Sequence, residues 1–213
     1  MPEQQERPTV FVVDDDPSMR SALARLLRSA DFAVETYASA DEFLASDARD
    51  QGPGCLVLDV RMPGLDGLAL QEALLSRDEA PPIIFITGHG DIPMAVDTMK
   101  KGAIEFLPKP FDDEQLLQAV RDGLEQDARA RALFAERAAI LKRVESLTPR
   151  EREVMTYVIT GLLNKQIAGA LGITEKTVIV HRGRVLQKMG VTSVAELVRL
   201  AAKAGVQAAP VAP

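Results

Sequence analysis

The chain has 213 residues, of which 46% are hydrophobic and 26% charged. This composition is ordinary for a folded protein and excludes a disordered chain. No basic N-terminal stretch leads into an apolar core, and no uncharged apolar run approaches the ~18 residues of a membrane helix. We therefore expect a cytoplasmic protein without membrane contact and, at about 100–200 residues per domain, one large domain or two small ones.

The net charge of −6 is unevenly distributed along the chain. Residues 1–125 hold 24 acidic and 11 basic side chains, whereas residues 145–213 hold five acidic and nine basic ones. A basic C-terminal third on an acidic chain favours a nucleic-acid-binding part joined to a different domain. Charge alone does not distinguish this arrangement from an ordinary uneven distribution of charge along the chain.

The first 125 residues alternate short apolar runs with stretches of helical spacing. The runs are rich in Val and Ile, are flanked by Asp, Gly or Pro, and lie at 10–13, 34–36, 55–58, 83–86 and 104–107. Such runs are typical of strands buried on both faces of a parallel sheet. Between them, Ser39 with Glu42 has the spacing of a capping box. The pattern predicts an α/β, flavodoxin-like (βα)5 domain over 9–125.

A long helical pattern without proline follows Asp112, which can cap it, and predicts a linker helix over 126–145. Within this linker, apolar residues recur at helical spacing at Phe134, Ala138, Leu141 and Val144. The stripe is compatible with a solvated spacer or with a short coiled-coil seam between two copies. Because it is short, it favours the seam only slightly.

The remaining sequence predicts an all-α domain of four helices over 146–205. Thr148 and Glu151 have the spacing of a capping box, with Pro149 at the first helical position. A glycine at 172 lies where the second helix should turn into the third. Helices of about 12, 8 and 15 residues joined in this way fit a helix-turn-helix whose last helix enters the major groove. Residues 206–213, rich in Ala and Pro, are expected to be a disordered tail.

Polar side chains stand at the carboxyl ends of the predicted strands, where open α/β sheets place their ligand sites. Asp14 and Asp15 follow the first strand, Asp59 ends the third, Thr87 ends the fourth and Lys109 follows the fifth. The first and third strands are neighbours in such a fold, so three carboxylates converge on one spot. Their like charges are costly unless a cation neutralises them, and hard oxygen ligands of this kind suit Mg²⁺.

A carboxylate beside Mg²⁺, with a hydroxyl and an ammonium close by, is suited to accept a phosphoryl group. Asp59 ends the central strand and is the best candidate for a nucleophile that forms an aspartyl phosphate. Asp15 would hold the metal directly and Asp14 through a water. Thr87 would hydrogen-bond a phosphoryl oxygen, and Lys109 would pair with the phosphate and neutralise its charge.

Four segments resemble the motifs of response regulator receiver domains, namely Val12–Asp16, Leu58–Gly64, Ile86–Gly88 and Phe106–Phe111. The resemblance implies that a sensor histidine kinase phosphorylates Asp59. It also implies that Asp15, Asp59 and the backbone carbonyl of Arg61 hold Mg²⁺.

The same resemblance implies a two-state switch and a cis Lys109–Pro110 bond, which is a cheap isomer only before proline. Thr87 would move toward the phosphate, and Phe106 would swing inward behind it. Phe106 lacks the hydroxyl of the Tyr that many members carry, so the packing of its ring would have to carry the switch.

Three segments of the C-terminal third resemble the LuxR-type DNA-binding domain, namely Leu147–Val154, Gly161–Ala168 and Thr177–Arg182. Together with the receiver motifs they are similar to the FixJ-like subfamily. The resemblance implies DNA contacts from the third helix and from the start of the second, and dimerisation through the fourth. We expect the contacts to come from Asn164, Lys165, Thr174, Lys176, Thr177, Val180, Arg182, Arg184 and Lys188.

One position departs from the family pattern, because Ile179 stands where many members have Lys or another polar residue. Either a phosphate or base contact is missing there, or Ile179 touches a thymine methyl group. His181 matches the family motif, and its expected role is packing and local hydrogen bonding.

These features predict a two-component response regulator that binds double-stranded promoter DNA and RNA polymerase and forms a homodimer when phosphorylated. We expect a transcription factor that catalyses only its own phosphoryl transfer and dephosphorylation at Asp59. An aspartate-nucleophile phosphatase is the alternative enzyme, but it usually has a second Asp where Arg61 stands. A flavin- or nucleotide-binding module would need a glycine-rich loop where the acidic residues 14–16 stand.

Overall fold

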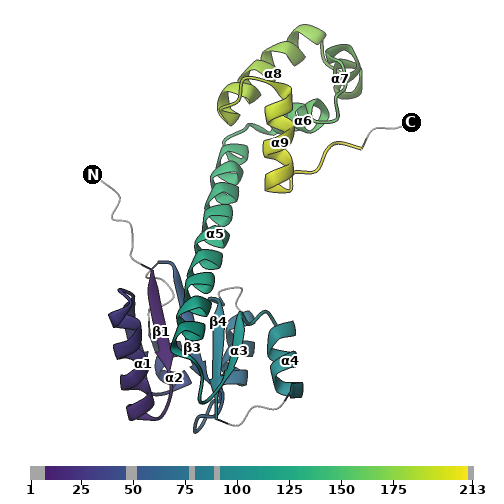
Figure 1. Cartoon of the computed structure of the whole chain (residues 1–213). Helices are drawn as coiled ribbons and strands as arrows, with labels where there is room; N and C mark the ends of the chain where they lie inside the picture. The colour runs from purple at the N-terminus through teal and green to yellow at the C-terminus, as the bar shows by residue number, and fades with distance from the viewer. Residues whose placement is uncertain (1–7, 47–51, 77–79, 89–91, 211–213) are drawn as a thin grey trace. The chain divides into compact units, whose positions relative to one another are not determined.

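The computed structural model describes residues 8–46, 52–76, 80–88 and 92–210 (Figure 1). Their contacts divide the chain into two compact units, Met1–Arg131 and Ala132–Pro213. The first unit holds a parallel sheet with helices, and the second is helical. Helix α5 (Asp113–Glu145) contributes residues to both units.

The sheet of the first unit has five parallel strands in the order β2-β1-β3-β4-β5. Their bounds are Thr9–Val13 for β1, Ala33–Tyr37 for β2, Gly54–Asp59 for β3, Ile83–Thr87 for β4 and Glu105–Pro108 for β5. Every residue of β3 and β4 is buried, as expected for strands covered on both faces. The five predicted apolar runs are thus the five strands, and the expected flavodoxin-like α/β fold is confirmed.

Helices cover both faces of the sheet. Side chains of α1 (Pro17–Ser29) and α5 pack into one core, and those of α2 (Ala40–Ala45), α3 (Gly67–Leu75) and α4 (Ile92–Lys100) pack into the other. The predicted caps form, because the Ser39 hydroxyl accepts from the Glu42 amide and the Asp112 carboxylate accepts from the Glu114 amide.

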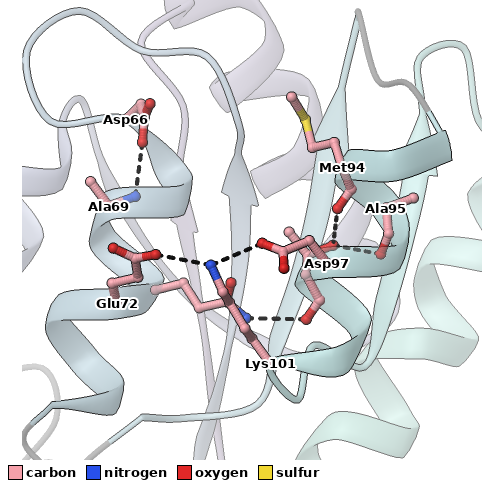
Figure 2. A network of polar contacts seen from close by, with 9 residues as sticks. Asp66, Ala69, Glu72, Met94, Ala95, Asp97 and Lys101 are labelled. Atoms are coloured by element: carbon pink, nitrogen blue, oxygen red, sulfur yellow. Dashed lines mark hydrogen bonds and ion pairs between the residues drawn. The ribbon is translucent and has the colours of Figure 1, made fainter.

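The side chain of Lys101 ties the end of α4 to α3 (Figure 2). Its Nζ lies 2.9 Å from Glu72 Oε1 and 2.9 Å from Asp97 Oδ2. The hydrogen bonds with these two carboxylates raise the pKa of Lys101. Such partly exposed pairs contribute little free energy each, so this contact adds little to the stability of the fold.

The long helix α5 is anchored on the sheet by a buried acid. Asp127 Oδ2 accepts from the backbone amide of Gly54 at 2.9 Å and from Arg131 Nε at 2.8 Å. Further along α5, the predicted apolar stripe divides into two groups. Val144 is buried with Ile140 in the core of the second unit, whereas Phe134 and Leu141 are exposed.

The second unit has the four predicted helices, α6 (Pro149–Val158), α7 (Asn164–Leu171), α8 (Glu175–Met189) and α9 (Val194–Ala204). The Thr148–Glu151 capping box starts α6, and Gly172 ends α7 in a left-handed conformation, with φ of 62°. Residues 206–210 have neither helix nor strand, but Val206 packs against the core of the second unit and the Ala209 amide donates to the Thr156 carbonyl at 3.1 Å, so this part of the expected disordered tail is held on the domain. Residues 211–213 of the expected tail lie outside the described residues. Among the described helices, none has the length and apolar character needed to cross a bilayer.

Candidate functional site

The acidic residues predicted to converge do so at the carboxyl edge of the sheet. Val13 of β1 pairs in register with Leu58 of β3, so the next residues, Asp14 and Asp59, face each other across the two strands. One carboxylate oxygen from each of Asp14, Asp15 and Asp59 lies within 4.8 Å of the other two. Asp14 and Asp59 are buried and Asp15 is exposed.

Lys109, which directly follows β5, brings one positive charge to this pocket. Its Nζ lies 3.0 Å from Asp14 Oδ2 and 3.0 Å from Asp59 Oδ1. Its backbone amide donates to the carbonyl of Thr87 at 2.7 Å, which fixes the loop after β5 against the end of β4. The Lys109–Pro110 bond is cis, as the resemblance implied. The pocket therefore brings together four of the predicted residues, with Thr87 at the adjoining strand end.

Burial and crowding set the electrostatics of the pocket. Burial raises the pKa of Asp59, the hydrogen bond from Lys109 lowers it, and the charges of Asp14 and Asp15 raise it again, with a net rise. Burial lowers the pKa of Lys109, but its hydrogen bonds to Asp59 and Asp14 more than offset this effect and raise it overall. The carboxylates thus hold more negative charge than one lysine balances.

The three acidic side chains fit a hard divalent cation. They offer only oxygen ligands, and their mutual repulsion would be relieved by an ion. Arg61 lies two residues beyond Asp59, between β3 and α3, and its side chain is exposed.

The two predicted switch residues share one face of the sheet. The register of β4 with β5 pairs Phe85 with Phe106 and Thr87 with Pro108. Because side chains alternate along a strand, Phe85, Thr87 and Phe106 lie on the same face. Thr87 is buried at the pocket, whereas the Phe106 ring is half-buried, with its centroid 6.4 Å from that of Phe85.

The predicted DNA-contacting residues lie on α7, on α8 and at the cap between them. Lys176, Val180 and Arg184 are exposed and four residues apart, so they form one row along α8. Lys165 at the start of α7 and Thr174, which caps α8, are also exposed, and Thr177 is half-buried.

Two predicted contact residues bind each other, because Arg182 Nη1 donates to Asn164 Oδ1 at 2.9 Å. This hydrogen bond orients the start of α7 against α8. Lys188 continues the row of Lys176, Val180 and Arg184 by sequence spacing, but its ammonium is held within the domain. Its Nζ lies 2.7 Å from Glu151 Oε2 and 3.1 Å from the Ser146 carbonyl.

The buried Glu151 is a residue whose full role the sequence did not indicate. Only its place in the capping box was visible, because its partner Lys188 is 37 residues away. The residue is 2% exposed, and its carboxylate also accepts from the Thr148 amide at 2.9 Å. Hydrogen bonds from Lys188 and from Thr148 lower the pKa of Glu151 to about 2.

We expect Glu151 to make the C-terminal unit sensitive to acid. Its pKa lies below the ordinary value of 4.5, so the stabilisation is complete above that pH and is lost as the pH falls toward about 2. Glu151→Gln should therefore lower the Tm at pH 7 by several degrees and show a smaller fall in Tm between pH 5 and 2. Glu153→Gln, at an exposed position on the same helix, is the control and should behave like the wild type. Identical Tm–pH curves for wild type and Glu151→Gln would contradict this assignment.

The fold and the acidic pocket define a receiver-type module, and the second unit defines a helix-turn-helix module. Comparison with known proteins agrees with both. The response regulator receiver domain matches residues 10–121, and the LuxR family of bacterial regulatory proteins matches residues 145–201. The chain belongs to the response regulators that carry a LuxR-type DNA-binding domain, and it is a regulator of transcription.

Similar proteins match both domains. Nodulation protein W of Bradyrhizobium diazoefficiens is 49% identical over 93% of this chain and 87% of that protein. The transcriptional regulatory protein FixJ of Azorhizobium caulinodans is 46% identical over 92% of this chain and 93% of its own length. The structure of the response regulator StyR has a TM-score of 0.83 and 53% identity over 92% of this chain and 99% of that one. The full-length FixJ structure from B. japonicum has a TM-score of 0.54 and 45% identity over 92% of this chain and 97% of that one.

Proposed function

We propose that this regulator accepts a phosphoryl group on Asp59 from a sensor histidine kinase and, once phosphorylated, binds promoter DNA as a homodimer. The observation that carries the proposal is the pocket in which Lys109 Nζ lies 3.0 Å from both Asp14 and Asp59. Because its ligand would be promoter DNA, the protein would act in the cytoplasm, where RNA polymerase would be its further partner.

The chain's own residues would carry out the transfer. A carboxylate oxygen of Asp59 forms a bond to phosphorus while the bond between phosphorus and the kinase histidine nitrogen breaks, and the nitrogen leaves with the electron pair. The ammonium of Lys109 leaves Asp59 and pairs with the phosphoryl oxygens instead. Asp14, Asp15, Asp59 and the Arg61 carbonyl would hold Mg²⁺, which when bound supplies positive charge against the phosphoryl oxygens.

Thr87 and Phe106 would pass the charge change to the surface. Thr87 stands at the pocket edge, and Phe106 lies on the same sheet face, half-buried. If the Thr87 hydroxyl turns to the phosphoryl group, the Phe106 ring can fill the space behind it. Such a two-state element links a local charge event to a surface change.

Exposed apolar side chains on α4 support phosphorylation-dependent association of two copies. Ile92, Val96 and Met99 are spaced by four and three residues, so they share a face of the helix. Ile92 is 80% exposed, which is unusual for a large apolar side chain without a partner protein. The fourth helix of the LuxR-type domain, α9, is the second contact that the family resemblance implies.

The row of exposed residues on α8 supports the DNA-binding half of the proposal. Lys176 and Arg184 suit phosphate contacts, and Val180 between them suits a base edge. The neighbouring Ile179 is 54% exposed, and Val180 is 46% exposed. Two adjacent exposed apolar side chains on a recognition helix favour contact with thymine methyl groups over a missing contact.

We expect Ile179 to make the protein prefer thymine over uracil at the contacted base, because uracil lacks the methyl group. Each buried methyl is worth about 0.8 kcal/mol, so replacing a contacted thymine with uracil should weaken wild-type binding by roughly four-fold. Ile179→Ala should lose most of this sensitivity, whereas Ala170→Ser, on the exposed surface of α7, should retain it. The measurement is competition between thymine and uracil forms of a duplex enriched from a random pool by the wild type. Equal binding of both forms by the wild type would contradict the contact.

The metal-dependent step is tested by intact-protein mass after incubation with acetyl phosphate. The wild type should gain one phosphoryl group with Mg²⁺ present and much less with a chelator, because the crowded carboxylates would otherwise repel the incoming anion. Equal gain under both conditions would contradict the assignment of Asp14, Asp15 and Asp59 as metal ligands.

A further inference from the structure

Three polar contacts converge on the C-terminal turn of α8, the helix proposed to read DNA. Lys188 Nζ donates to Glu151 Oε2 at 2.7 Å and to the Ser146 carbonyl at 3.1 Å. Arg143 Nη1 donates to the Met189 carbonyl at 3.1 Å. Arg143 lies in the last turn of α5 and Ser146 directly follows that helix, so these contacts join the end of α8 to the junction of α5 and α6.

The contacts between α5 and α8 are reciprocal. The last carbonyls of a helix accept no hydrogen bond from within that helix, and they carry a partial negative charge. Arg143 of α5 supplies a cation to the last turn of α8, and Lys188 of α8 supplies a cation to the carbonyl that follows α5. Each helix thus satisfies the C-terminal end of the other.

The backbone and the core at this junction allow the end of α8 to lie close to α5. Gly190 ends α8 with φ of +65°, and a Cβ there would lie 3.3 Å from Arg143 Nη1. Below the polar contacts, Met189 shares one buried core with Ile140 and Val144 of α5. The end of α8 is therefore held to α5 by apolar packing as well as by charge.

The buried partner argues that Lys188 does not contact DNA phosphate. Glu151 is 2% exposed, and a carboxylate left buried without its cation is strongly destabilising. Two of the three N–H groups of this ammonium are already donated, and a phosphate that drew it away from Glu151 would leave that buried charge uncompensated. The contacts with Glu151 and with the Ser146 carbonyl thus hold Lys188 on partners inside the domain.

We propose that Arg143 and Lys188 are positioning residues that clamp the recognition helix α8 to the end of α5, and that neither binds DNA. The proposal rests on the proposed DNA-binding function of α8. It makes the last turn of α5 part of the DNA-reading unit, because a change in its orientation would be transmitted to α8 through the clamp.

The test is the affinity of the full chain for two duplexes of equal length, at several salt concentrations. One duplex is enriched from a random pool by the wild type, and the other has its sequence scrambled. Stoichiometric titration determines the concentration of protein that is able to bind DNA, so that affinities are compared per active molecule. Arg143→Gln and Lys188→Gln should each weaken binding to the enriched duplex by about ten-fold, the equivalent of one charge-assisted hydrogen bond. Binding to the scrambled duplex and the slope of log K against log salt should stay near wild type, because no phosphate contact is lost.

Two variants serve as references for these measurements. Arg184→Gln removes a proposed phosphate contact, so it should weaken binding to both duplexes and reduce the salt slope by about 0.9. Lys142→Gln removes the same charge from an exposed position beside Arg143 and should behave like the wild type.

Glu151→Gln distinguishes the two possible assignments of Lys188 by the sign of its effect on affinity. If Lys188 is part of a clamp, loss of the Glu151 charge weakens the clamp and lowers affinity for the enriched duplex. If Lys188 contacts phosphate, the freed ammonium leaves affinity unchanged or raises it. The second result, or a Lys188→Gln salt slope that falls as in Arg184→Gln, would overturn the proposal. Unchanged affinities per active molecule in both Arg143→Gln and Lys188→Gln would also overturn it, because the residues would then only stabilise the fold. A wild type with no preference for any duplex would instead refute the proposed DNA-binding function.

Discussion

The Asp59→Ala chain should gain no mass when it is incubated with acetyl phosphate and Mg²⁺, whereas the wild type should gain one phosphoryl group. Among the three clustered carboxylates, Asp59 is the one that ends the central strand β3. It is buried beside the exposed Asp15, and its Oδ1 lies 3.0 Å from Lys109 Nζ. Its removal takes away the nucleophile and not merely a neighbouring charge. Intact-protein mass spectrometry measures the gain directly.

A matched control separates loss of the nucleophile from loss of acidic charge. Asp16→Asn neutralises an exposed residue of the same acidic run and keeps a side chain able to cap α1, so it should be phosphorylated like the wild type. Hydroxylamine should remove the added group from both, because it cleaves an acyl phosphate. A hydroxylamine-sensitive gain by Asp59→Ala would assign the phosphoryl group to another carboxylate and contradict the account.

Lys109→Met should slow phosphorylation by roughly 10²-fold, the scale seen when one group that stabilises transition-state charge is removed. Its ammonium contacts both Asp14 and Asp59, and after transfer it would pair with the new phosphoryl oxygens. The variant also leaves two buried carboxylates facing each other without their cation. The rate of mass gain from acetyl phosphate at saturating Mg²⁺ measures the effect.

Lys101→Met is the control for this variant. Lys101 also pairs with two carboxylates in the same unit, but its partners Glu72 and Asp97 belong to α3 and α4 (Figure 2). Its loss should leave the phosphorylation rate unchanged. A Lys109→Met rate equal to that of the wild type would show that the ammonium has no part in the transfer.

The first domain could be predicted from the sequence because its site depends on strand ends. A parallel sheet brings its carboxyl ends to one edge, so Asp14, Asp59 and Lys109 converge once the strands are located. The burial of Asp14 and Asp59 beside an exposed Asp15 could not be predicted, because it depends on side-chain packing around the pocket.

The linker and helix α8 show what residue spacing alone does not reveal. Phe134 and Val144 lie on one stripe by spacing, but only Val144 reaches a core, because the second unit packs against the last turns of α5. Lys188 lies in a basic row by spacing, but its ammonium pairs with Glu151, which is distant in the sequence. Periodicity identifies the face of a helix and not the partner that occupies it.

The central claim, that phosphorylation of Asp59 controls DNA binding, is tested most directly by measuring affinity with and without phosphorylation. The wild type and Asp59→Ala would be titrated onto the enriched duplex before and after treatment with acetyl phosphate and Mg²⁺, with oligomeric state measured alongside. Treated wild type should dimerise and bind more tightly, while Asp59→Ala should stay at the untreated level. Equal affinity and equal oligomeric state of treated and untreated wild type, at confirmed phosphorylation, would contradict it.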